Sequence, residues 1–249
     1  MGSMPSWNLH TAHVERLLAD RPARDLGIED VNAFLFGNYV PDIYVGFMVH
    51  DASVHVDYCL THCAKVGLIP IPGADQFWDL YIYKRRPTAP AGLSLTLGAW
   101  AHLVSDRFYN GLFHAFLETH DVPEGEELRI RKQEDFDLFG HTLGISSLVQ
   151  ITPELLEAAQ RFRGYSVLSG DVEKAVEVAN RIVRKSAAAP VNQEYQLLSA
   201  EWMSETFEAC NERLVRWLEA WRALELGGKN VSAEEIRAEL DLCSADEYL

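Results

Sequence analysis

The 249-residue chain has few cysteines, and it lacks a long apolar run. Its four cysteines are too sparse for a disulfide framework. Cys59 and Cys63 bracket His62 in CLTHC, but no second cysteine pair stands at zinc-finger spacing, so we expect buried free thiols. No stretch approaches the roughly 20 uninterrupted apolar residues of a membrane span. No apolar run follows a basic stretch near the start, so we expect no secretory signal and a cytoplasmic location.

Basic residues are also scarce. The 22 Lys and Arg residues face 37 Asp and Glu residues, which gives a formal net charge of −15. This balance argues against a protein that coats nucleic acid, because phosphate backbones need neutralisation by Lys and Arg. It does not exclude phosphorylated substrates, because bound divalent cations can supply positive charge locally.

Apolar residues recur at helical spacing through most of the chain, and no alternation typical of strands persists beyond a few residues. A Pro- and Gly-rich stretch after residue 66 predicts a long loop with a short helix over 75–81. Ser232 and Glu235 form a capping-box pattern, and Thr152-Pro153 marks another helix start. The helices are expected over 8–21, near 27–42, over 51–66, from about 94 to 120, and in the segments TPELLEAAQRF, GDVEKAVEVANRIVRK, 194–226 and SAEEIRAEL. The predicted fold class is therefore all-α.

The histidines are unevenly distributed, since all nine precede residue 142. The sequence therefore places any chemistry in the first half. We expect residues 4–150 to form a helical metal-site region and residues 151–249 to form a helical region that packs on it, in one compact domain.

Five segments place His or Asp beside apolar helical residues, where an unpartnered polar group would cost several kcal/mol. His102 and Asp106 are four residues apart, so on a helix both side chains can aim at one point. Imidazole nitrogen and carboxylate oxygen are zinc ligands. In the alternative interpretation, Asp106 simply accepts a hydrogen bond from His102 inside the core. The five groups are His10 and His13; Asp42; His50, Asp51, His55, Asp57 and His62; His102, Asp106, His114 and His120; and Asp135, Asp137 and His141.

The segments HTAHVERLL, FLFGNYVPDIY and LGAWAHLVSDRF, with a His after the second and another further on, resemble the zinc-dependent phospholipase C family. More distantly, they resemble zinc-dependent single-strand nucleases. The resemblance spans about residues 7–144, and GNYVPD and AHLVSD are its most specific parts. It implies an all-α fold of that type, here with additional C-terminal helices, and up to three zinc ions in a cleft.

The resemblance also implies roles for individual residues. His13 would be the early ligand, with His10 as its alternative, and Asp42 would be a ligand or the general base. The next ligand would be His55, with His50 as its alternative. His102 would be a metal ligand, and the carboxylate of Asp106 would bridge two metal ions. His114 and His141 would bind a further metal ion, with His120 as the alternative to His114.

The chain departs from the family pattern at two positions. The family has a Glu four residues after its later His, whereas this chain has Ile145, and Asp137 is the candidate substitute. In secreted members an N-terminal Trp contributes to a zinc site, but Trp7 lies inside this chain. We therefore expect one or two zinc ions rather than three.

The resemblance implies a zinc-dependent phosphoesterase in which metal-activated water hydrolyses a small phosphate ester or a lipid head group. Asp42 would orient or deprotonate that water. A second enzyme class is the all-α phosphohydrolases that have an adjacent His-Asp pair, which His50-Asp51 and His120-Asp121 resemble. These enzymes also need an earlier His and a later Asp, which His13 and Asp106 could supply for the pair His50-Asp51. Metal bound at His50-Asp51, with Asp42 remote, would favour that class. The third alternative is a non-catalytic helical binding protein with a degenerate site, which Ile145 and the long amphipathic helix near residues 202–221 suggest.

Overall fold

The segments that carry the candidate ligands fold as helices, as does most of the chain. The computed structural model describes residues 6–67, 69–122, 125–186 and 194–240. Those residues form one compact domain without a strand, which confirms the all-α fold class. The phospholipase C type of architecture stays a prediction. The helices are α1 (Trp7–Asp20), the 3-10 helix η1 (Ala23–Leu26), α2 (Val31–Gly37), α3 (Val40–Ile43), α4 (Tyr58–Thr61), α5 (Ala74–Trp78), the π-helix η2 (Asp79–Tyr83), α6 (Pro90–His120), α7 (Glu126–Thr142), α8 (Pro153–Gln160), α9 (Ser169–Ser186), α10 (Ala200–Leu226) and α11 (Ala233–Glu239).

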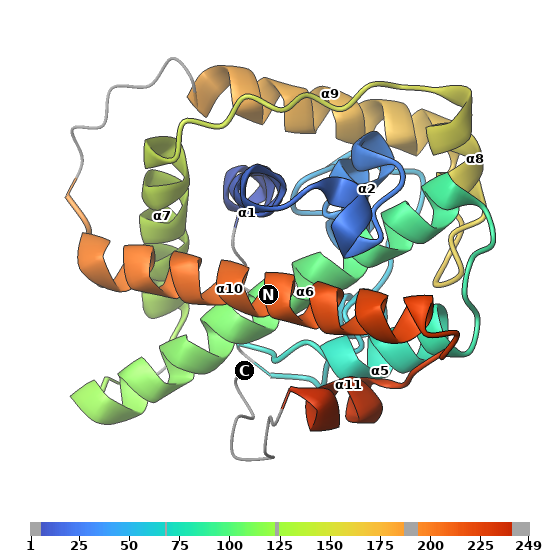
Figure 1. Cartoon of the computed structure of the whole chain (residues 1–249). Helices are drawn as coiled ribbons and strands as arrows, with labels where there is room; N and C mark the ends of the chain where they lie inside the picture. Colours follow the sequence, from blue (N-terminus) through green and yellow to red (C-terminus); the bar gives the residue numbers. More distant parts are fainter. Residues whose placement is uncertain (1–5, 68, 123–124, 187–193, 241–249) are drawn as a thin grey trace.

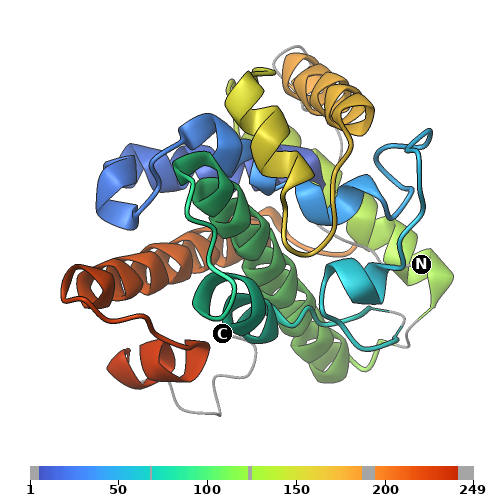
Figure 2. The ribbon, with the colours of Figure 1, turned by 90° about the vertical axis from the view of Figure 1, so that its right-hand side faces the viewer.

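The 31-residue helix α6 runs through the middle of the domain. Every residue from Leu93 to Asp106 is buried, which is typical of a helix surrounded by protein on all sides. In Figures 1 and 2, α8 and α9 lie on one side of α6, and α10 and α11 lie on the other. The pair His102 and Asp106 is therefore carried by the central helix of the core.

Helix α1 is also enclosed. Figure 1 shows it almost end-on, with α7, α9 and α10 around it, and each of these helices contacts it. Trp7, Leu9, Val14 and Leu17 are buried in these contacts. The early histidines of α1 therefore point into the protein interior rather than toward solvent.

Helices α2 and α6 approach each other closely because two glycines meet at their crossing. A Cβ atom at Gly98 would lie 2.1 Å from the carbonyl oxygen of Phe34, and one at Gly37 would lie 2.2 Å from that of Leu95. No side chain fits between the two backbones. The contact brings Asn38, at the end of α2, beside His102 on α6.

Most predicted helices are confirmed, although the helix expected from residue 194 begins at Ala200 and the one expected from about residue 94 begins at Pro90. The Ser232/Glu235 capping box is formed at α11, and the Thr152 side chain caps α8. The helix expected over 51–66 is wrong, because only Tyr58–Thr61 is helical there. Asp57 caps the start of α4 by accepting from the Cys59 N–H, which marks where that short helix begins, and the Ser53 N–H before it donates to Asp171 of α9 instead of to a helical carbonyl. Among the described residues, no helix has the length and apolar character needed to cross a bilayer.

Candidate metal centre

Five buried His and Asp side chains meet where α1, α3 and α6 converge with the end of α4. We call them the His–Asp cluster, and each is at most 1% exposed. Its members are His10 of α1, Asp42 of α3, His62 directly after α4, and His102 and Asp106 of α6. Two overlapping sets within the cluster, His10 with His102 and Asp106, and Asp42 with His62 and His102, have ligand atoms within 4.8 Å of one another. The cluster could therefore hold a metal ion.

The pair on α6 forms one edge of the cluster. His102 Nε2 lies 3.5 Å from Asp106 Oδ2. His102 Nδ1 lies 2.7 Å from the carbonyl oxygen of Asn38, which can only accept a hydrogen bond, so Nδ1 carries a hydrogen. In the neutral ring this leaves the Nε2 lone pair directed at the cluster, which is the tautomer that metal binding requires.

Asp42 and His62 complete the same set. His62 Nε2 lies 3.5 Å from Asp42 Oδ1, 3.7 Å from Asp106 Oδ2 and 3.1 Å from His102 Nε2. Asp42 Oδ1 lies 3.8 Å from His102 Nε2. Two neutral imidazoles cannot both direct lone pairs at each other at 3.1 Å without a proton or a cation between them.

These separations match the edges of a metal coordination shell. Four ligands arranged tetrahedrally at about 2.0–2.2 Å from zinc lie about 3.3–3.6 Å from one another. The five distances given above among Asp42, His62, His102 and Asp106 run from 3.1 to 3.8 Å. Asp42, His62 and His102 therefore have the spacing of three ligands on one ion, while Asp106 belongs to the overlapping set with His10 and His102.

Several polar atoms of the cluster lack a hydrogen-bond partner among the described residues. They include Asp42 Oδ1, Asp106 Oδ1 and both ring nitrogens of His10. His10 Nε2 lies 3.2 Å from Asp106 Oδ1, but neither atom makes an aligned hydrogen bond. Unsatisfied polar atoms are costly in a protein interior. Cations bound at the two ligand sets of the cluster would satisfy these oxygens and one nitrogen of His10.

Neighbouring residues fix the orientation of the ligands. The Trp7 indole donates to Asp42 Oδ2 at 2.9 Å, so the other carboxylate oxygen is turned toward His62 and His102. The His62 ring stacks on Tyr58, and its Nδ1 lies 2.8 Å from Thr61 Oγ1. These contacts around the cluster are of the kind that orient metal ligands.

The protonation of the metal-free cluster is uneven. Burial lowers the pKa of His10 and of His62, and the proximity of His102 lowers both further. Burial also acts to lower the pKa of His102, but the carboxylates of Asp106 and Asp42 outweigh it and raise that pKa to about 9. Burial would raise the pKa of Asp106, yet His102 and His10 hold it well below its usual range. One imidazolium thus faces two carboxylates, so a divalent cation could replace its proton.

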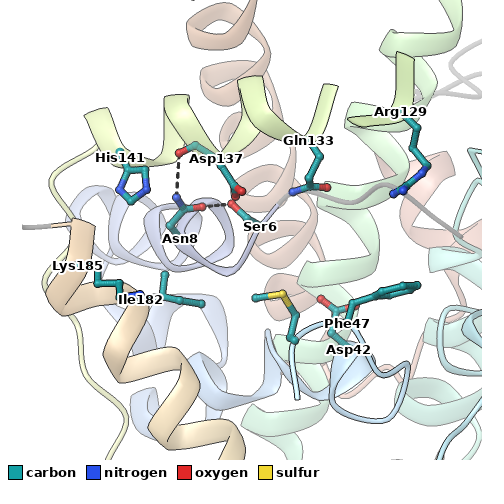
Figure 3. Close-up of a pocket in the computed structure, with 11 residues that line it drawn as sticks. Ser6, Asn8, Asp42, Phe47, Arg129, Gln133, Asp137, His141, Ile182 and Lys185 are labelled. Carbon is teal, nitrogen blue, oxygen red and sulfur yellow. Dashed lines mark hydrogen bonds between the residues drawn. The ribbon is translucent and has the colours of Figure 1, made fainter. Parts of the chain in front are cut away.

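A pocket of about 370 Å³ reaches the cluster at Asp42. In Figure 3, side chains of α7 lie along one side of it, and Phe47 and Asp42 lie opposite. Asn8 of α1 lines the pocket and donates a hydrogen bond to the carbonyl oxygen of Asp137 on α7 at 3.1 Å, which links the two helices at the pocket. Its lining combines positive, polar and apolar groups: Ser6, Asn8, Asp42, Phe47, Met48, Arg129, Gln133, Asp137, His141, Ile182 and Lys185.

Four of the predicted site residues, His10, Asp42, His102 and Asp106, are brought together by the fold. His13, which was expected to be the early ligand, is buried but turns to α10 and α6, with Nδ1 3.1 Å from Asn211 Oδ1 and Nε2 3.2 Å from the Tyr109 hydroxyl, and its alternative His10 takes the place in the cluster. Burial lowers the pKa of His13 to about 3, although the Asn211 contact opposes this.

The other predicted ligands lie outside the cluster. His50 and His55 are exposed in the loop before α4. His114 binds the carbonyl oxygen of Ile69 at 2.9 Å, and the exposed His120 lies 2.8 Å from that of Phe116. His141 lines the pocket together with Asp137, and its Nδ1 has no hydrogen-bond partner among the described residues.

Ile145, which stands where the resembled family has a Glu, is packed in the core at 2% exposure. The cluster member missing from the predicted ligand set is His62. The only signal for it was its place among the other His and Asp residues of 50–62, because helical spacing does not apply to this irregular stretch. Cys59 and Cys63 beside it are free and only partly buried, rather than buried as expected.

Comparisons of the chain with family models, with curated proteins and with solved structures found no significant match.

Proposed function

We propose that the protein is a metal-dependent phosphoesterase, with zinc as its metal. The observation that carries this proposal is the combination of two features at one point: a buried cluster of His and Asp side chains that forms two overlapping sets of possible metal ligands, and a pocket that meets the cluster at Asp42. Mixed imidazole and carboxylate ligation suits zinc better than magnesium or calcium, which favour oxygen ligands.

Asp42, His62 and His102 would hold one ion, and His10, His102 and Asp106 form the overlapping ligand set beside it. A second ion bound on the side of His10 could share His102 as a ligand. The expected number of bound zinc ions therefore stays at one or two. When bound, zinc supplies Lewis-acid activation of water and of phosphoryl oxygens.

The chain's own residues would bind and orient the substrate. Arg129 and Lys185 place positive charge in the pocket, which suits a phosphate ester. Phe47, Met48 and Ile182 offer apolar surface to the alcohol portion of that ester. Asp42 belongs to both the cluster and the pocket, so it is placed either to hold the ion or to accept a proton from the attacking water. The substrate class is a small phosphate ester or a lipid head group.

The test is hydrolysis by the purified full-length chain. We expect zinc in the protein by elemental analysis, and hydrolysis of bis(4-nitrophenyl) phosphate or 4-nitrophenyl phosphate that a chelator abolishes and zinc restores. Phosphatidylcholine vesicles test whether the protein also hydrolyses a lipid head group. Asp42→Asn should lower kcat/KM by about 100-fold or more, which corresponds to one lost transition-state contact. His55→Asn, at an exposed position, serves as the matched control. A protein without metal and without hydrolysis would contradict the proposal.

A structural metal site is the second candidate, because the buried side chains of the cluster could fill every coordination position of an ion. Structural zinc sites are typically closed in this way, whereas catalytic sites keep one position open. The burial of all the cluster residues favours this candidate, and the pocket at Asp42 favours the enzyme. If the protein holds one tightly bound zinc but hydrolyses neither nitrophenyl phosphate nor phosphatidylcholine, the site is structural.

The remaining alternatives gain no support from the geometry. For the His-Asp doublet class, His50 and Asp51 are exposed, while Asp42 lies in the cluster. For a partner-binding protein, the apolar face of α10 is already buried against the rest of the domain, including Met203, Phe207, Leu214 and Trp221.

A further inference from the structure

The pocket that meets the His–Asp cluster at Asp42 continues along α7. Four α7 residues at a spacing of four line it, so its wall passes over successive turns of the helix: Arg129, Gln133, Asp137 and His141. Twelve residues of α-helix correspond to about 18 Å along the axis. Figure 3 shows Arg129 and Asp42 toward one end of the pocket, and His141 and Lys185 toward the other. The pocket is therefore an elongated groove with two distinct ends, which we call the α7 groove.

The end of the groove remote from the cluster carries positive charge without a counterion. Lys185 of α9 is exposed there and makes no ion pair or hydrogen bond with the described part of the chain. Its ammonium group can only donate hydrogen bonds. A negatively charged acceptor would therefore satisfy this end of the groove in both charge and hydrogen bonding.

His141, at the end of α7, adds a second donor beside Lys185. Its Nδ1 is buried and has no hydrogen-bond partner among the residues that the structure describes. The ring lines the groove and is only partly buried. An imidazole with its hydrogen on Nε2, or a protonated one, donates to an acceptor. No protein contact described here opposes that form, so the ring can donate to a group bound in the groove.

Between its two ends, the groove offers no cation. Gln133 and Asp137 are the α7 residues of this middle part, and Met48 and Ile182 contribute apolar surface to the lining. An anionic group in the middle would meet the carboxyl group of Asp137 and no positive charge. A neutral segment, by contrast, fits both the polar and the apolar side chains. At the cluster end, positive charge returns with Arg129, which also pairs with an exposed glutamate of α7.

We propose that the α7 groove binds a phosphate ester that carries a second anionic group at the far end of its alcohol portion. The inference rests on the proposed phosphoesterase function, because the reacting phosphate would lie beside Asp42. The second anion, a phosphate or a carboxylate group, would lie at Lys185 and His141 and would accept charge-assisted hydrogen bonds from them. The neutral part of the ester would span the middle of the groove. The groove would thus select substrates by length and by the number of anionic groups.

The test is isothermal titration calorimetry of the purified full-length chain with α,ω-alkanediol bisphosphates, from butane-1,4-diol to dodecane-1,12-diol. Each is compared with the alkyl monophosphate of the same length. We expect the longer bisphosphates, which reach both ends, to bind at least about 10-fold more tightly than their monophosphates, because hydrogen bonds between charged groups are the strong ones. The shortest bisphosphate should gain little. Equal affinities throughout, or a gain independent of length, would overturn the proposal.

Variants assign the second anion to its place in the groove. Lys185→Met removes the unpaired charge at an exposed position, so it should abolish the advantage of the long bisphosphates and leave binding of the monophosphates unchanged. His141→Asn should reduce the same advantage. Arg184→Met is the matched control, because Arg184 is an exposed cation of α9 outside the groove lining. A loss in Arg184→Met equal to that in Lys185→Met would show a general effect of surface charge and would reject the site.

Hydrolysis assays separate this inference from the proposed function. Hydrolysis of 4-nitrophenyl phosphate without any preference for bisphosphates in binding overturns the second-anion site and leaves the phosphoesterase in place. Length-dependent binding of bisphosphates without hydrolysis of any ester supports the two-anion groove and overturns the phosphoesterase. Vesicles that contain phosphatidylinositol 4-phosphate identify the source of the ligand: if they displace the bisphosphate, the two anions belong to a lipid head group, and otherwise they belong to a soluble ester.

Discussion

His62 and His55 belong to the same stretch of chain but have opposite environments, which makes them a matched pair for substitution. His62 is fully buried in the His–Asp cluster, and His55 is exposed. We expect His62→Asn to weaken zinc binding by more than about 100-fold, because even changes beyond the direct ligands cost about 10–100-fold. His55→Asn should leave zinc binding unchanged. Zinc content after dialysis against a competing chelator measures both, and full retention by His62→Asn would remove this residue from the ligand set.

Lys132 on α7 is a fully buried cation that the proposed chemistry does not use. Its Nζ donates to Asn110 Oδ1 at 2.5 Å and lies over the rings of Phe113 and Phe136. Burial lowers its pKa from 10.5 to about 7, although Asp106 opposes this. Because the folded pKa is below the unfolded one, Lys132 destabilises the fold fully below about pH 7, and the penalty shrinks as the pH rises toward 10.5.

Lys132→Met should therefore raise the free energy of unfolding, and by about 2–3 kcal/mol more at pH 6 than at pH 9. Urea unfolding at the two pH values measures the difference. Lys185→Met, at an exposed lysine of α9, is the control and should show no such pH dependence. A gain for Lys132→Met that is equal at both pH values would show that the lysine does not titrate in this way.

The sequence could identify Asp42, His102 and Asp106 because a helical repeat or a helix end fixes where each of them points. It favoured His13 over His10, which lies three residues away on the same helix, and the structure reverses this order. The choice depends on neighbours distant in sequence: Asp106 faces His10, whereas Asn211, near the middle of α10, faces His13. His62 was not identified for the same reason, since its position depends on how the loop around it folds.

At the scale of helices, the crossing of α2 and α6 controls the geometry of the cluster. Gly98→Ala would place a methyl group about where the carbonyl oxygen of Phe34 now lies, so the two helices must move apart. We expect a loss of about 2–4 kcal/mol in the free energy of unfolding, typical of overpacking a core. Zinc affinity should also fall, because Asn38 and His102 would separate.

Gly170→Ala on α9 is the matched control, because nothing lies within 4 Å of its added methyl group. This substitution should stabilise the protein by up to about 1 kcal/mol through helix propensity. Chemical unfolding and zinc titration of both variants test the pair. Unchanged zinc affinity in Gly98→Ala would show that the crossing does not position the ligands.

Most helices were predictable because apolar spacing and caps are local signals. The helix from residue 200 to 226 and the capping box at Ser232 show this directly. The segment 51–66 was predicted wrongly, because Asp57 starts a helix only at residue 58 and Asp171 of α9 binds the Ser53 N–H before it. The α2–α6 approach was also beyond local reasoning, since a glycine pair has meaning only once the two helices are known to cross.

At the scale of the whole molecule, metal removal should destabilise the domain. Two buried carboxylates with one imidazolium stay uncompensated when no divalent cation is bound. We expect EDTA to lower Tm by about 5–10 °C at pH 7 and zinc to restore it, as a ligand that binds the folded state tightly requires. Asp106→Asn should be insensitive to EDTA. Differential scanning calorimetry measures the shift, and an unchanged Tm in the wild type would argue against a bound ion.

The last residue of the His–Asp cluster in the sequence is Asp106. The helices α7, α9 and α10, which enclose α1, begin at residue 126 or later. During translation the proposed ligands therefore leave the ribosome before their cover does. The proposed ion would therefore meet these side chains while they are still open to the medium, and the later helices would close over it afterwards.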